Sequence, residues 1–174
     1  KYASFLSIRV PEPYRRLIRR HSRRLGSCPT GRLSEELRKV LSSGNGSDIL
    51  LRCLRLGLLS ELLPAVASRV HSRRQDPLFI ELQRIERSSP EREEVRLQSM
   101  AALSLAVGGI NGSYSLQSVK QAFAPLVITN DDARAVVDAV SSGLSTSCYG
   151  TRTSNVKYRS GVRRKRRSRD RKTS

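Results

Sequence analysis

The stretch DILLRCLRLG, residues 48–57, decides the fold class. Its apolar side chains surround most of a helical axis, which predicts a central helix that begins at Ser47 and Asp48 and is closed by Gly57. Cys53 lies inside this run and is interpreted as one more small hydrophobic side chain rather than a nucleophile. A helix that is apolar on most sides needs other helices packed around it.

Helical patterns continue on both sides of this segment. Residues 30–43 have Thr30 as N-cap and an apolar stripe at helical spacing, and residues 58–70 contain a new helical turn that begins at Pro64. No long alternating pattern of strand type occurs, and the sequence therefore predicts an all-α fold, an irregular multi-helix bundle. Further helix starts are predicted at Asp76, Ser89, Ser115 and Asn130.

The charge of the chain is concentrated at its two ends. The 174 residues include 33 Lys and Arg against 15 Asp and Glu, a net charge of +18. Residues 1–24 and residues 163–172 each contribute +7, which leaves +4 for the middle of the chain. We expect three parts: an N-terminal arm at 1–12, a helical domain at 13–144 and a disordered basic tail at 145–174.

An arginine-rich helix is predicted over PYRRLIRRHSRRLG, residues 13–26. Its arginines occupy about half of the helix circumference, and Leu17, Ile18, His21 and Leu25 fill the other half. We expect the apolar half to pack against the body and the arginine half to bind a polyanion, in preference to being only a solvated face. The candidate RNA-binding residues of this helix are Arg15, Arg16, Arg19, Arg20, Arg23 and Arg24.

The basic tail supplies a second set of candidate RNA-binding residues. They lie in VRRKRRSRDRKTS and are Arg163, Arg164, Lys165, Arg166 and Arg167. A run of this composition is also typical of a nuclear localisation signal, and this alternative stays open at the level of sequence.

The sequence contains no pattern of residues that predicts an active site or a metal site. The two histidines, His21 on the apolar side of the arginine helix and His71 beside a basic loop, are interpreted as a packing residue and a surface residue, and the three cysteines form no CxxC pair. Asp131 and Asp132 are interpreted as structural, because both lie in the first turn of a helix. We expect no catalytic residue, no metal, no bound cofactor and no membrane partner, and a cytoplasmic location.

Three consecutive stretches carry a resemblance to a known family. They are RRHSRRLG at 19–26, PTGRLSEELRKVLSSGN at 29–45 and LRCLRLGLLSELLP at 51–64. Together they resemble the neck and early body of the class II nucleotidyltransferase superfamily, which comprises bacterial poly(A) polymerases and CCA-adding tRNA nucleotidyltransferases. The positions that match the family patterns are Arg32, Leu33, Glu36, Leu37, Lys39, Val40 and Leu41, followed by Leu51, Leu54, Gly57, Leu58, Leu59, Leu62, Leu63 and Pro64.

The resemblance implies roles for particular residues. Arg32 and Glu36, one helical turn apart, would brace the neck, although the same spacing is also that of an ordinary surface ion pair. Gly31 stands where the family pattern has Glu. The basic tail is more similar to the extension of poly(A) polymerases than to CCA-adding enzymes, and it makes RNA-degradation or RNA-processing proteins candidate partners.

The same resemblance implies that nucleotide addition is catalysed by a part of the protein other than this chain. The family's catalytic head, with its GGxxRD motif and metal-binding Asp-x-Asp pair, is absent from this chain, so ATP and Mg²⁺ are implied only for that missing head. The first hypothesis is therefore that the chain is the C-terminal neck, body and tail part of a bacterial-type poly(A) polymerase, which holds RNA while a separate head adds AMP to its 3′ end without a template. The alternatives are a stand-alone helical protein that binds RNA or the ribosome, and a partner-binding module whose tail is only a localisation signal.

Overall fold

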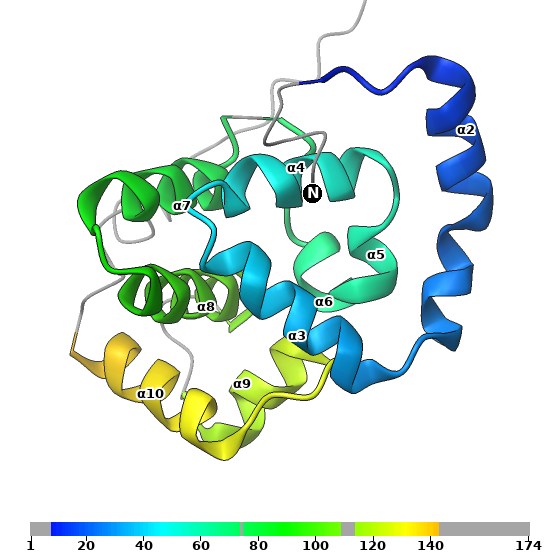
Figure 1. Cartoon of the computed structure of the whole chain (residues 1–174). Helices are drawn as coiled ribbons and strands as arrows, with labels where there is room; N and C mark the ends of the chain where they lie inside the picture. Colours follow the sequence, from blue (N-terminus) through cyan, green and yellow to red (C-terminus); the bar gives the residue numbers. More distant parts are fainter. Residues whose placement is uncertain (1–7, 74, 109–113, 143–174) are drawn as a thin grey trace, which may run out of the picture.

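The computed structural model describes residues 8–73, 75–108 and 114–142, and these ranges are helical without a strand (Figure 1). The predicted all-α fold is confirmed. The predicted disordered tail, with Arg163, Arg164, Lys165, Arg166 and Arg167, lies outside the described residues.

The helices follow one another with short connections. In chain order they are α2 (Glu12–His21), the 3-10 helix η1 (Ser22–Ser27), α3 (Thr30–Leu41), α4 (Gly46–Arg55), α5 (Leu59–Leu62), α6 (Pro64–Ala67), α7 (Pro77–Ser88), α8 (Arg92–Gly108), α9 (Leu116–Phe123) and α10 (Asn130–Ser141).

Local chemistry sets several of these boundaries, although Thr30, predicted as an N-cap, is instead the first residue of α3 and no side chain caps that helix. The side chain of Asp76 accepts a hydrogen bond from the Leu78 amide and caps α7, while Ser115 caps α9 in a reciprocal pair with Ser118. Gly57 ends α4 with a φ of 75° in the left-handed region, where a glycine is favoured. These three predicted boundaries are confirmed.

The cap of α10 differs from the prediction by one residue. Thr129, not Asn130, accepts a hydrogen bond from the Asp132 amide, at 3.1 Å. Asn130 instead accepts a hydrogen bond from Lys120 Nζ at 2.6 Å and so ties α10 to α9. Asn130 therefore serves a tertiary contact and leaves the capping to its neighbour.

The helix at the centre of the bundle is α8, which packs against α3, α6, α7, α9 and α10. Its middle is fully buried and rich in small side chains such as Ala101, Ala102 and Ser104, which let neighbouring helices approach closely. The expectation that residues 48–57 form the central helix is wrong in this respect. In α4, Ile49, Leu50 and Leu51 are buried, whereas Arg52 and Arg55 line a cleft at the surface of the bundle, with Leu51 at its base.

A buried ion pair joins α8 to α10. Arg96, 3 % exposed, donates to Asp132 Oδ1 at 2.9 Å and also binds Glu93. Burial alone would raise the pKa of Asp132, but the hydrogen bond and charge of Arg96, with Thr129 and Arg38, lower it overall. The structural interpretation of Asp132 agrees with this geometry.

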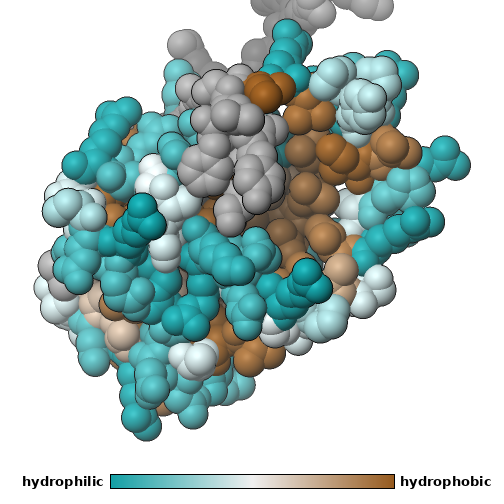
Figure 2. Space-filling model, viewed as in Figure 1, coloured by the Kyte–Doolittle hydropathy of each residue, from teal (hydrophilic) through white to brown (hydrophobic). Residues whose placement is uncertain are grey.

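The arginine-rich helix is shorter than predicted and is oriented differently. It ends at His21, where the Ser22 hydroxyl donates to the Arg19 carbonyl at 3.1 Å and the chain tightens into η1. No residue of α2 is buried, and Leu17 is 53 % exposed, so the expected packing of its apolar half is wrong. Figure 1 shows α2 standing along one side of the bundle, and Figure 2 shows apolar side chains gathered on that side.

Within the described ranges, no helix combines the length and the apolar character that crossing a membrane requires.

Candidate nucleic-acid interface

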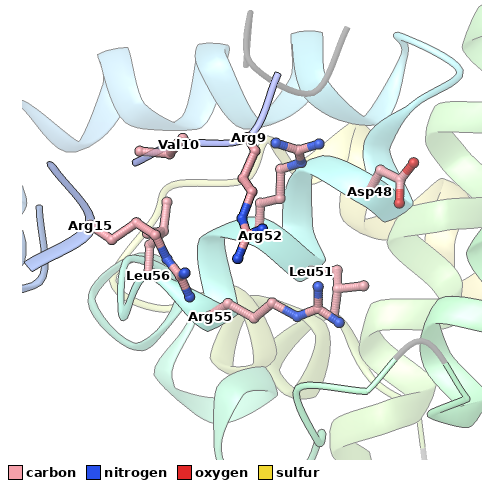
Figure 3. A pocket seen from close by; sticks show the side chains of 8 residues that line it. All are labelled: Arg9, Val10, Arg15, Asp48, Leu51, Arg52, Arg55 and Leu56. Atoms are coloured by element: carbon pink, nitrogen blue, oxygen red, sulfur yellow. The ribbon is translucent and has the colours of Figure 1, made fainter. Parts of the chain in front are cut away.

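A cleft lies between the N-terminal segment, α2 and the outer side of α4 (Figure 3). Its cavity has a volume of about 350 Å³, and four of its lining side chains are arginines. The lining residues are Arg9, Val10, Arg15, Asp48, Leu51, Arg52, Arg55 and Leu56.

Arg52 and Arg55 come from consecutive turns of α4, and main-chain oxygens hold both of them in place. Arg52 donates to the carbonyl oxygen of Ile8 at 2.7 Å, and Arg55 Nε donates to that of Ser72 at 3.2 Å. Because a guanidinium has five N–H donors, each of these arginines keeps donors for a ligand.

The start of α4 is fixed from another helix. Glu86 of α7 accepts hydrogen bonds from the Ser47 amide at 2.7 Å and from the Ser47 hydroxyl at 2.6 Å. This carboxylate satisfies a free amide of the first turn and complements the positive end of the helix dipole. The position of Arg52 and Arg55 therefore depends on the contact between α4 and α7.

Arginines also attach α2 to α4. Arg19 donates from two nitrogens to the carbonyl oxygen of Arg55, at 3.1 and 3.2 Å. Glu12 lies 2.9 Å from Arg15, 3.7 Å from Arg16 and 3.9 Å from Arg19. Arg15 and Arg19 thus face the body, on the side where the sequence led us to expect the apolar residues.

The six candidate arginines of residues 13–26 consequently differ in their surroundings. Arg15 lines the cleft, and Arg19 connects the two helices. The other four are exposed: Arg16 and Arg20 on α2, and Arg23 and Arg24 on η1. The predicted single face of six arginines is wrong, because Arg15 and Arg19 are turned toward the body within α2 itself, and the chain continues as a 3-10 helix after His21.

The proposed neck brace lies on α3. Glu36 is bound by Lys39 Nζ at 2.9 Å, and this contact raises the pKa of Lys39. Arg32 is exposed one turn earlier on the same helix. The pairing of Arg32 with Glu36 stays a prediction.

Sequence reasoning missed Arg9, Arg52 and Arg55 as site residues. Arg52 and Arg55 were passed over because their helix was interpreted as central. Their spacing of three residues in an otherwise apolar helix was the available signal, since it places both on one side. Arg9 precedes the helical pattern and carried no comparable signal.

The cleft is suited to binding an anion. Its four arginines outnumber the one carboxylate, that of Asp48, and its apolar lining from Val10, Leu51 and Leu56 strengthens nearby charge interactions by excluding water. Guanidinium groups match phosphate oxygens in geometry. Among the residues that the structure describes, no group of three His, Cys, Asp or Glu side chains could hold a metal ion.

All eight lining residues fall within residues 9–69. That segment matches the family described as "Probable RNA and SrmB- binding site of polymerase A". The match covers α2 to α6 and the three stretches that carry the resemblance noted above, and it supports RNA binding by a part related to poly(A) polymerases. Neither the curated proteins nor the solved structures gave a match.

Proposed function

We propose that this chain is the RNA-binding part of a poly(A) polymerase in the cytoplasm. It holds RNA while a nucleotidyltransferase head outside this chain adds AMP to the 3′ end, and ATP and Mg²⁺ belong to that head. The observation that carries the proposal is the arginine cleft, whose lining lies entirely inside the segment that matches the polymerase RNA-binding family.

The chemistry of the cleft favours contacts to phosphates over contacts to bases. Arginines supply most of its polar lining, and no aromatic side chain is among the described residues that line it, so we expect base stacking by these residues to contribute little. The exposed arginines Arg16, Arg20, Arg23 and Arg24 would extend the contact along α2 and η1. Binding of this kind depends weakly on RNA sequence and strongly on salt.

The basic tail would add to this contact. Its residues 163–167 carry five positive charges in succession. We assign them either to RNA or to RNA-degradation and RNA-processing proteins that act on the same transcript.

The test is RNA binding by the chain at several salt concentrations. The probe is a labelled single-stranded oligo(A), and the variant is Arg52→Gln with Arg55→Gln. Loss of two phosphate contacts should reduce the slope of log K against log[salt] by about 1.4. The matched control, Arg92→Gln with Arg134→Gln, removes the same charge from exposed positions on α8 and α10 and should keep most of the affinity.

Equal loss in the two double variants would show that only net charge matters, and the cleft would then not be the RNA site. Thermal unfolding of each variant establishes that a loss of binding does not come from a loss of structure.

A further inference from the structure

The charges of the cleft exceed what one phosphodiester can balance. Four arginines and one carboxylate line the cavity, and Glu12 binds Arg15 at 2.9 Å, which leaves an excess of two positive charges. A single phosphodiester carries one negative charge and would leave half of this excess without compensation beside a partly apolar lining. The charge therefore favours a ligand that carries several negative charges.

The arginines are spread along the cavity rather than directed at one point. In Figure 3, Arg9 and Arg15 reach over α4, while Arg52 and Arg55 leave α4 in different directions. The carbonyl oxygens of Ile8 and Ser72 keep Arg52 and Arg55 apart. Guanidinium groups held in different directions suit an extended chain of phosphates better than one compact anion.

We propose that the cleft binds a run of adjacent phosphate groups rather than an isolated phosphate. The proposal rests on the proposed function in one respect, the source of the phosphates. Successive phosphodiesters of single-stranded RNA are the source that the proposed function implies. The oligophosphate of a nucleoside triphosphate has the same chemistry and is the second source to be tested.

The experiment measures direct binding to the full chain by calorimetry at constant ionic strength. Inorganic tripolyphosphate and inorganic orthophosphate are the two probes that test the proposal itself. Tripolyphosphate should bind at least about tenfold more tightly than orthophosphate. Arg52→Gln with Arg55→Gln should remove most of this difference, and the control Arg92→Gln with Arg134→Gln should keep it.

Basic residues elsewhere in the chain bind tripolyphosphate equally in all variants, so the informative quantity is the difference between the two double variants. A further variant, Arg52→Lys with Arg55→Lys, keeps both positive charges but loses the bidentate hydrogen bonds that a guanidinium makes to phosphate. We expect it to bind tripolyphosphate with intermediate affinity. Equal binding of tripolyphosphate and orthophosphate, or equal losses in the cleft and control variants, would overturn the proposal.

Two more ligands identify the source of the phosphates. A short oligo(A) with three phosphodiesters should depend on Arg52 and Arg55, and ATP should bind no more tightly than tripolyphosphate. If oligo(A) binds but tripolyphosphate shows no preference, the phosphate-run proposal fails and RNA binding stands. If tripolyphosphate and ATP bind at the cleft but oligo(A) of any length does not, the cleft proposal stands and the proposed RNA-binding function fails.

Discussion

Arg19 of α2 donates hydrogen bonds from Nε and Nη2 to the main-chain oxygen of Arg55 at the end of α4. The same side chain lies 3.9 Å from Glu12. No residue of α2 is buried, so polar contacts of this kind, rather than a hydrophobic interface, hold the helix beside the bundle. One side of the cleft is therefore attached less firmly than the other.

The first prediction concerns this attachment. Arg19→Ala should speed amide hydrogen exchange in residues 12–21 and leave exchange in α8 unchanged, because α8 packs in the core. The free energy of unfolding should fall by less than about 1 kcal/mol, since the contact is exposed. Unchanged exchange in α2 would mean that other contacts hold the helix. Arg20→Ala, an exposed neighbour on α2, is the control.

The second prediction concerns the buried pair Arg96 and Asp132. Arg96→Met removes the guanidinium and leaves a buried carboxylate without its main partner, so the free energy of unfolding should fall by about 3 kcal/mol. Denaturation by urea measures it. Arg92→Gln, on the exposed first turn of α8, should change stability by less than about 0.5 kcal/mol. Similar losses in the two variants would contradict this role for Arg96.

The pair of Arg96 and Asp132 also makes the stability of the fold depend on pH. The pKa of Asp132 is held below its ordinary value of 3.8, chiefly by Arg96 acting against burial, and the hydrogen bond from Arg96 also lowers the pKa of Glu93. A carboxyl whose pKa is lower in the folded state stabilises that state above its unfolded pKa and loses this contribution as the pH falls through the folded pKa. The urea concentration at the midpoint of denaturation should therefore decrease when the pH is lowered below about 4.

Asp132→Asn is the variant that isolates this effect. It should be less stable than the wild type near neutral pH, and its midpoint should change less on acidification. Parallel acid profiles for the two proteins would assign the pH dependence to other carboxyls.

Local chemistry explains how much of this fold could be predicted. Asp76, Ser115 and Gly57 act on their own helix ends, so the sequence alone was sufficient to locate those boundaries. The burial of Arg96, by contrast, depends on a partner farther along the chain. Its partner Asp132 lies 36 residues away, and the periodicity of apolar residues in the sequence does not indicate a contact over that distance.

The cleft was missed for the same reason. Arg9 and Arg55 are far apart in sequence, and only the fold brings them to one cavity. The arginine helix was correctly recognised as cationic, but its orientation was not. Periodicity places Leu17 and Arg19 on different sides of a helix without saying which side faces the bundle. The hydrogen bonds of Arg19 and the charge of Glu12 favour the arginine side.

The fourth prediction concerns the cap that positions α4. Glu86→Ala removes the acceptor for the amide and hydroxyl of Ser47, and the free energy of unfolding should fall by about 1–2 kcal/mol. A double-mutant cycle with Ser47→Ala measures the coupling. The double variant should be destabilised by less than the sum of the single variants. Additive losses would show that the two residues act independently.

The last prediction concerns Glu12, the carboxylate among the arginines of α2. It lies within 4 Å of Arg15, Arg16 and Arg19 and partly neutralises the surface that we assign to RNA. Glu12→Gln should therefore strengthen binding of single-stranded oligo(A) severalfold at low salt, by about 0.5–1 kcal/mol, and the gain should shrink as salt screens it. Asp138→Asn makes the same change in charge at an exposed site on α10 and should have a much smaller effect. Weaker binding by Glu12→Gln would mean that Glu12 instead orients the arginines for RNA, and equal gains in both variants would reduce the effect to net charge.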